Sequence, residues 1–254
     1  MLMMKDDINI LKWKIKVKRM ANKGHKNRQK RISYNGRCQI KRKEFVWTFN
    51  QAPGPYAKNT GATLGSIIRD ILHFADNSRE IKYILTNKDC RVNGKRIKDE
   101  HFPLGLFDVL EFKDVDKRYR IFLNNKNKFV LKDLSKEKLF RPCRIVSKKI
   151  ITGSNIQLGF DNGFSWILPK TVKANVGDTV EYNIEKAKFG EITKLQENAQ
   201  VYVVGGPHVS KIGILKAIVK GDVTKANEIT VESEGKTFKT REKYVFVIPN
   251  DLKL

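Results

Sequence analysis

The sequence predicts a multi-domain α+β protein that is mostly β, with a basic N-terminal arm, a small helical module, a central β domain and a C-terminal β-barrel. Helical periodicity is confined to the stretch from Thr60 to Phe112, which also holds a hairpin. After Phe112 the apolar residues form short runs at strand spacing, separated by turn residues. The length of 254 residues is enough for two or three small domains.

The net charge of +24 is the most unusual property of the composition, because the hydrophobic share of 40% is ordinary for a globular protein. Such a charge calls for a polyanionic partner: nucleic acid, an acidic membrane face or an acidic protein. No window approaches the roughly 20 apolar residues of a membrane span, and we expect no secretion signal. Three scattered cysteines, Cys38, Cys90 and Cys143, indicate a reducing, cytoplasmic compartment.

The basic arm spans residues 20–43. Up to Lys43 the chain has 15 Lys and Arg against two acidic residues, Asp6 and Asp7. From Met20 there is little apolar periodicity and no carboxylate, so we expect the arm to stay unfolded until RNA orders it. The alternative is a solvated solubility tail. The arm residues expected to contact RNA are Lys23, His25, Lys26, Arg28, Lys30, Arg31, Arg37, Lys41, Arg42 and Lys43.

Residues 1–19 have a different pattern, because Leu11, Trp13, Ile15 and Val17 alternate with lysines. This alternation is typical of a β-strand with one apolar face. An interfacial segment and a translated leader without a structural role remain open.

The predicted helical module begins with an apolar stripe at helical spacing: Leu64, Ile67, Ile68, Ile71, Leu72 and Ala75. A second helix is predicted after Asn77, with Glu80 in the capping-box position. Asn93-Gly94 predicts a tight hairpin turn. The module and the connector before it carry further candidates for RNA contact: Lys58, Arg69, Arg79, Lys82, Arg91, Lys95, Arg96 and Lys98.

The second half of the chain reads as β throughout. A hairpin is predicted around residues 124–127, followed by short strands over 143–151, 155–158, 165–168 and 179–184. From about Asn198 further short strands surround a Gly205-Gly206 turn, which favours a five-stranded barrel. Gly213 within a strand pattern indicates a bulge or a close backbone approach.

Two motifs carry a family resemblance. The segments GATLGSIIRDILHFADNSREIKYIL and VNGKRIKDEHFPLGLFDVLEF resemble the S-four RNA-binding domain, and VYVVGGPHVSKIGIL is similar to a KOW motif. MANKGHKNRQKR, from Met20, matches the usual start of the e-type protein four family of the small ribosomal subunit (S-four-e), so residues 1–19 fall outside the resemblance. The lack of a long C-terminal extension suits an archaeal member. Members more often carry glycine where Ser210 stands.

The resemblance implies an S-four-type RNA-binding domain over 44–115, a central β domain over 116–196 and a KOW, SH3-like barrel over 197–254. It implies a structural constituent of the small (30S) subunit that binds 16S-type rRNA in the cytoplasm, beside neighbouring ribosomal proteins and with no membrane contact. It also implies that the KOW loop contributes to RNA contact through Gly205, Gly206, His208 and Lys211.

An enzyme is the competing class, and the sequence does not favour it. Its four histidines are far apart and lack ligands at metal spacing, and no phosphate-binding glycine motif occurs. We therefore expect no cofactor, metal or small-molecule substrate. The remaining alternatives are an S-four-domain RNA-modifying enzyme, such as a pseudouridine synthase, and a free RNA chaperone or translation factor.

Overall fold

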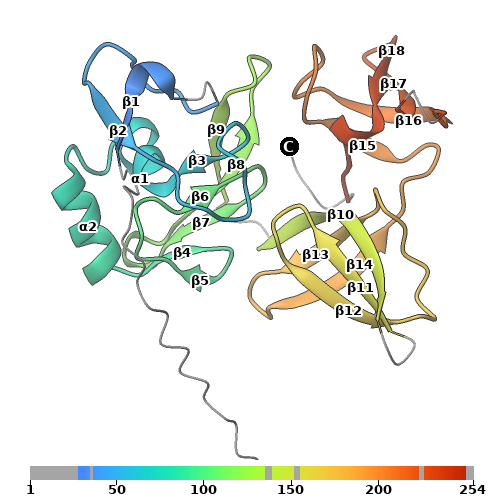
Figure 1. Cartoon of the computed structure of the whole chain (residues 1–254), viewed down its shortest axis with the longest axis horizontal. Coiled ribbons are helices and arrows are strands. Elements are labelled where there is room, and N and C mark those ends of the chain that lie inside the picture. The colour runs from blue at the N-terminus through green and yellow to red at the C-terminus, as the bar shows by residue number, and fades with distance from the viewer. Residues whose placement is uncertain (1–27, 35–36, 135–138, 152–154, 223–225, 250–254) are drawn as a thin grey trace, which may run out of the picture.

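Three lobes succeed one another along the chain in the computed structural model, which describes residues 28–34, 37–134, 139–151, 155–222 and 226–249 (Figure 1). Each lobe is built on a five-stranded antiparallel sheet. The sheet orders are β5-β4-β7-β8-β9, β12-β11-β10-β13-β14 and β18-β17-β16-β15-β19. Within the described residues, no helix has the length and apolarity that a membrane crossing requires.

The N-terminal lobe joins its sheet to two short helical segments. The sheet consists of β4 (Cys90–Val92), β5 (Lys95–Arg96), β7 (Val109–Phe112), β8 (Lys117–Leu123) and β9 (Phe129–Asp133). The pairs β1 (Arg28–Lys30) with β2 (Trp47–Phe49) and β3 (Ala62–Thr63) with β6 (Pro103–Leu104) complete its strands. Short 3₁₀ turns occupy η1 (Arg31–Ser33) and η3 (Lys113–Val115).

The predicted first helix forms, but in a mixed geometry. It starts as α1 (Leu64–Ser66), where the Thr63 Oγ1 accepts from the Ser66 N–H at 3.3 Å, and continues as a π-helical segment, η2 (Ile67–Ile71). The first half of the apolar stripe is fully buried, while Ile71 and Leu72 are half-buried. The helix ends because His73 adopts a left-handed φ of 52°.

The second helix, α2 (Ser78–Asn87), has the predicted capping box. The Glu80 carboxylate accepts from the backbone N–H of Asp76 at 2.8 Å and of Asn77 at 3.5 Å. Ile81 and Leu85 face the core of the lobe. The hairpin turn is also confirmed, because Asn93 and Gly94 both have positive φ, 50° and 82°.

The arm differs from its prediction where it is described. β1 pairs with β2 in the register Arg28↔Phe49 to Lys30↔Trp47, and Tyr34 and Cys38 are buried in the core of the N-terminal lobe. The expectation of an unfolded arm is therefore wrong for its described residues, 28–34 and 37–43. The average composition of the arm is polar, but Tyr34 and Cys38 supply enough buried apolar surface to hold it against the lobe. Lys23, His25, Lys26 and residues 1–19 lie outside the described residues.

The central lobe contains β10 (Phe140–Ile151), β11 (Asn155–Phe160), β12 (Ser165–Pro169), β13 (Thr179–Asn183) and β14 (Lys188–Thr193). Four of these were predicted, and β14 was not. The hairpin predicted around residues 124–127 is β8–β9, but it pairs with β7 of the N-terminal lobe. The boundary expected at 115/116 thus falls inside a continuous sheet.

The C-terminal lobe contains β15 (Gln200–Val203), β16 (Ile212–Val219), β17 (Glu228–Ser233), β18 (Lys236–Arg241), the 3₁₀ turn η4 (Glu242–Tyr244) and β19 (Val245–Val247). The close approach predicted at Gly213 is present, because a Cβ there would lie 2.4 Å from the Glu232 carbonyl oxygen. Across the sheet, Val201, Leu215 and Val231 form a separate small core.

The lobes share buried contacts. The Tyr202 hydroxyl donates to the Leu123 carbonyl oxygen at 3.1 Å, and the Phe107 ring lies 5.0 Å from the Phe246 ring. Tyr202 and Phe246 therefore belong to the core of the N-terminal lobe although they come from the C-terminal lobe. The central lobe joins the N-terminal lobe through a buried ion pair between Arg141 and Asp108.

Candidate nucleic-acid interface

Most of the predicted module cations lie on or next to α2 and the β4–β5 hairpin of the N-terminal lobe, elements that are labelled in Figure 1. Five of them, together with Lys88 at the end of α2, give six exposed cations here: Arg79, Lys82, Lys88, Lys95, Arg96 and Lys98. Three of the six, Arg79, Lys88 and Lys98, have no side-chain partner among the described residues. We call the six residues the α2–hairpin face. Cations that form no internal ion pair are the ones best placed to neutralise phosphate.

Asp89 holds together the cations at the end of α2. Its carboxylate accepts from Arg91 at 2.8 Å and lies 3.9 Å from both Arg96 Nε and Lys113 Nζ. The hydrogen bond from Arg91 lowers the pKa of Asp89 below its ordinary value. Three cations around one carboxylate leave a net positive charge, so Asp89 orients them without cancelling their field.

The hairpin turn faces the central lobe, which sequence reasoning did not anticipate. A Cβ at Gly94 would lie 3.1 Å from the Ile184 carbonyl oxygen, and the Lys95 ammonium sits 4.8 Å from the centroid of the Phe164 ring. Arg96 donates to the Thr86 carbonyl oxygen at 3.0 Å. Both predicted hairpin cations are exposed, but each has an intramolecular contact that RNA would have to share.

Arg31 and Arg69 lie on two sides of Asp70. Arg31 is 1% exposed; it donates to the Asp70 carboxylate at 3.0 Å and to the Lys41 carbonyl oxygen at 2.9 Å. Arg69 is half-buried, donates to the same carboxylate at 3.0 Å, and lies 4.8 Å from the Phe49 ring centroid. The structure therefore places Arg31 inside the lobe. Arg69 is held against the lobe by its hydrogen bond to Asp70, so neither guanidinium points outward as an RNA contact would require.

The other arm cations remain at the surface. Arg28, Lys30, Arg42 and Lys43 are exposed and have no side-chain partner among the described residues. Lys41 is exposed and lies 3.7 Å from Glu44. Two further predicted residues flank the connector: Lys58 is exposed, and Arg37 is half-buried and donates to the Thr60 carbonyl oxygen at 3.3 Å.

The predicted loop of the C-terminal lobe is built around two aromatic rings. A Cβ on Gly205 would lie 2.5 Å from the Tyr244 ring, and Gly206 has a φ of 89°. The half-buried His208 ring is centred 4.1 Å from Phe238, and the Lys211 ammonium is 5.7 Å from the same ring. The glycines thus shape the loop, whereas His208 and Lys211 present polar groups on it.

Ser210 occupies a left-handed position in this loop, with a φ of 69°. Glycine adopts that conformation without strain, so the backbone at this position favours the glycine expected from the resemblance. In this chain the Ser210 side chain hydrogen-bonds Tyr202, although burial still raises the pKa of Tyr202.

Sequence reasoning missed a cluster of exposed apolar side chains beside β1 and β2. Ile32, Phe45, Val46 and Trp47 are 74%, 60%, 64% and 49% exposed. Periodicity cannot reveal such a cluster, because two short segments from either side of a loop form it. The FVWTF run itself was the available signal.

Sequence reasoning also missed the polar junction between the N-terminal and central lobes. Arg141 Nη2 donates to the Tyr56 hydroxyl at 2.8 Å and to the Asp161 carboxylate at 3.3 Å. Burial raises the pKa of both Tyr56 and Asp161. The polar atoms of these titratable groups hydrogen-bond one another. Within the described residues, no cluster of His, Cys, Asp and Glu could hold a metal ion.

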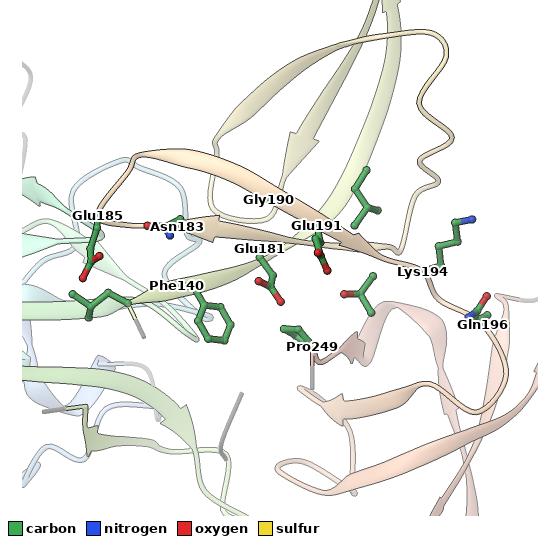
Figure 2. Close-up of a pocket in the computed structure, with 12 residues that line it drawn as sticks. Phe140, Glu181, Asn183, Glu185, Gly190, Glu191, Lys194, Gln196 and Pro249 are labelled. Atoms are coloured by element: carbon green, nitrogen blue, oxygen red, sulfur yellow. The ribbon is translucent and has the colours of Figure 1, made fainter. Parts of the chain in front are cut away.

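A groove of about 900 Å³ separates the paired strands β13 and β14 from the end of the C-terminal lobe (Figure 2). Its lining includes Glu181, Glu185 and Glu191, with Phe140 and Pro249 across from them. Figure 2 shows the Glu181 and Glu191 side chains beside the same space. Carboxylates repel phosphate, and the three glutamates outnumber the one lysine of the lining, Lys194, so the groove is electrostatically unfavourable for nucleic acid.

Comparison with known proteins gives the family. A family model described as "Ribosomal family S4e" matches residues 115–189. The chain is 34% identical over 233 residues to the small ribosomal subunit protein eS4 of Methanosphaera stadtmanae, covering 91% of this chain and 96% of that protein. It is 31% identical to the eS4 protein of Nanoarchaeum equitans, over 81% of this chain and 87% of that protein.

The fold agrees with this result. The crystal structure of the 30S ribosomal protein S4e from Thermoplasma acidophilum matches with a TM-score of 0.63 and 32% identity, over 75% of this chain and 96% of that chain. The mostly β architecture with few helices agrees with that structure, and the matches cover nearly the whole length of the archaeal relatives. The chain belongs to the S4e family of ribosomal proteins.

Proposed function

We propose that this protein is a structural constituent of the small ribosomal subunit and binds its rRNA without catalysing a reaction. The 34% identity with a protein named small ribosomal subunit protein eS4, over 91% of the chain, carries this proposal. A net charge of +24 supports it, because the self-repulsion of such a chain is relieved on a polyanion. Its place is then on the ribosome, in the cytoplasm, beside neighbouring ribosomal proteins.

We assign an S-four-type RNA-binding module to the N-terminal lobe, with wider bounds than the 44–115 that the sequence suggests. Pairing of β1 with β2 extends it toward residue 28, and pairing of β7 with β8 extends it to β9. The central β domain then comprises β10 to β14. The C-terminal lobe is the KOW-type unit, with its glycine loop between β15 and β16.

The RNA surface combines the α2–hairpin face with the exposed arm cations around β1. The loop of the C-terminal lobe, with Gly205, Gly206, His208 and Lys211, forms a further contact. Each phosphate that these cations neutralise releases condensed counterions, which supplies affinity without reading sequence. Arg31 supports this surface from inside, because its guanidinium holds the arm against Asp70.

Sedimentation of cell extracts through a sucrose gradient tests the proposal. We expect the protein to remain with the small subunit after a high-salt wash, because a structural constituent is held by many contacts. Release into the soluble fraction would instead favour a free RNA chaperone or translation factor. Transient association with precursor subunits alone would favour an RNA-modifying enzyme.

A further inference from the structure

We infer that Phe45 and Trp47 form a stacking platform for unpaired bases of an RNA strand. This inference rests on the proposed function and adds to it a mode of contact that phosphate neutralisation does not provide. The two rings are 60% and 49% exposed, and they lie on the segment that enters and begins β2. Large exposed aromatic side chains on a soluble protein indicate a binding surface.

The platform is held rigidly from below by Arg31. The Arg31 N–H donates to the Val46 carbonyl oxygen at 3.0 Å, and its Nε donates to the Trp47 carbonyl oxygen at 3.4 Å. The guanidinium carbon lies 5.0 Å from the centroid of the Phe45 ring. Because Arg31 is itself fixed by Asp70, the backbone beneath both rings is ordered before any ligand arrives.

The surroundings of the two rings favour RNA over an apolar protein partner. Residues 28–47 contain seven Lys and Arg against one carboxylate, Glu44. Lys30 pairs directly opposite Trp47, and Arg28, Arg42 and Lys43 are exposed nearby in the chain without a side-chain partner among the described residues. A hydrophobic protein interface would have to desolvate these cations, whereas protein interface cores are depleted of charge. Aromatic rings within a basic surface are the usual platform for single-stranded nucleic acid.

Space for a base is present beside the platform. A cleft of about 880 Å³ opens next to Phe45, and its lining includes Lys41, Arg69, Tyr119 and Lys128. Pockets of this size accept ligands larger than a nucleobase. A strand that stacks on Trp47 and Phe45 can therefore place a neighbouring nucleotide in this cleft. Its charged lining residues are Arg31, Lys41, Arg69 and Lys128 together with Glu44, Asp70 and Asp76, and Asp70 is already paired with Arg31 and Arg69.

Binding of the full-length chain to two matched strands tests the inference. The first is a single-stranded oligoribonucleotide of about 12 nucleotides, within the range of known single-strand sites. The second has the same backbone but carries abasic sites, so it has the charge without the bases. The wild-type chain should bind the first strand about tenfold more tightly than the second.

Substitutions at one ring separate stacking from simple hydrophobic contact. Trp47→Leu keeps apolar area but removes the π-face, and it should remove most of the preference for the strand with bases. Trp47→Phe should retain most of it. Ile167→Ala, at a 58% exposed apolar position on the central lobe, is the matched control and should leave both affinities unchanged.

The outcomes distinguish this inference from the function on which it rests. If the wild-type chain binds both strands equally, stacking is overturned while phosphate binding stands. If Trp47→Leu binds both strands like the wild type yet fails to enter the small subunit, the surface docks a protein and the inference is overturned. A wild-type chain that binds neither strand overturns the inference, whereas the proposed function is decided separately by sedimentation with the small subunit.

Discussion

The guanidinium of Arg141 lies 2.8 Å from the carboxylate of Asp108, and the two side chains are 0% and 2% exposed. Arg141 belongs to β10 of the central lobe, and Asp108 immediately precedes β7 of the N-terminal lobe. The Asp108 carboxylate also accepts from the Tyr56 hydroxyl at 2.9 Å and from the Asn93 side chain at 2.8 Å. One carboxylate thus joins the connector, the hairpin turn and the central sheet.

The substitution Asp108→Ala should destabilise the protein strongly. It leaves the buried Arg141 charge without its closest carboxylate, and breaking such a pair costs about 3–5 kcal/mol. Denaturant unfolding followed by circular dichroism measures the loss. Glu232→Ala, which breaks the exposed pair with Lys216 at 2.8 Å, is the matched control and should cost at most about 1 kcal/mol. Equal losses in the two variants would mean that the junction contributes no more than a surface pair.

The three cysteines should make stability fall at alkaline pH. Burial raises the pKa of each of Cys38, Cys90 and Cys143 from 9.0 to about 12. A raised folded-state pKa means that the folded form keeps its proton longer. The contribution of each thiol is therefore complete below pH 9 and is lost as the pH rises toward about 12.

The Cys143→Ala variant tests this dependence against the wild type. Between pH 9 and about 12 the wild-type free energy of unfolding should fall more steeply, by about 1.4 kcal/mol per pH unit for the one thiol removed. Below pH 8 the two curves should run parallel. If the curves stay parallel across the alkaline range, the Cys143 thiol does not titrate differently in the folded and unfolded states.

Local chemistry in the sequence predicted the parts of the fold that depend on neighbours along the chain. The Asn77–Glu80 capping box and the Asn93-Gly94 turn are set by residues within four positions of each other, and both formed. Arg31 could not be assigned in this way, because its partner Asp70 is 39 residues away. From sequence alone, a basic run is predicted to be a solvated arm. Only the tertiary structure shows that a distant carboxylate pairs with one of its arginines.

The sheet that the β8–β9 hairpin joins could not be predicted, for a similar reason. The β8–β9 hairpin has the same local pattern whether it joins the sheet before it or the sheet after it. Its pairing with β7 depends on the register from Val109↔Arg120 to Phe112↔Lys117. The residues that contact RNA are harder to predict than the fold, because composition does not distinguish an exposed arginine such as Arg79 from a buried one such as Arg31.

Gly205→Ala should destabilise the C-terminal lobe, because the added Cβ would lie 2.5 Å from the Tyr244 ring. Overpacking of this kind typically costs about 1–3 kcal/mol. Thermal unfolding followed by near-ultraviolet circular dichroism measures the effect. Gly190→Ala is the control, because its Cβ would meet nothing closer than 3.5 Å. A Gly205→Ala variant as stable as the control would show that Tyr244 moves aside at little cost.

We expect Arg79 and Lys98 of the α2–hairpin face to neutralise phosphate more effectively than the cations of this face that have intramolecular contacts. Arg79 and Lys98 are exposed and have no side-chain partner among the described residues, so replacing both with Ala removes two free charges. The slope of log affinity against log salt should then flatten by about 1.4 to 1.8, taking 0.7 to 0.9 per phosphate contact. Binding should weaken alike for matched and mismatched RNA, since phosphate contacts position a protein without reading bases. Filter binding across a salt series gives the slope.

The double variant of Lys95 and Arg96 is the informative comparison, because both charges already have intramolecular contacts. Lys95 lies over the Phe164 ring, and Arg96 donates to the Thr86 carbonyl oxygen. Replacing them with Ala should flatten the slope by less than the first pair does. If the Lys95 and Arg96 variant has the larger effect and loses discrimination between RNAs, the hairpin reads base edges or shape. In that case the division of the face into free and internally held cations would have to be abandoned.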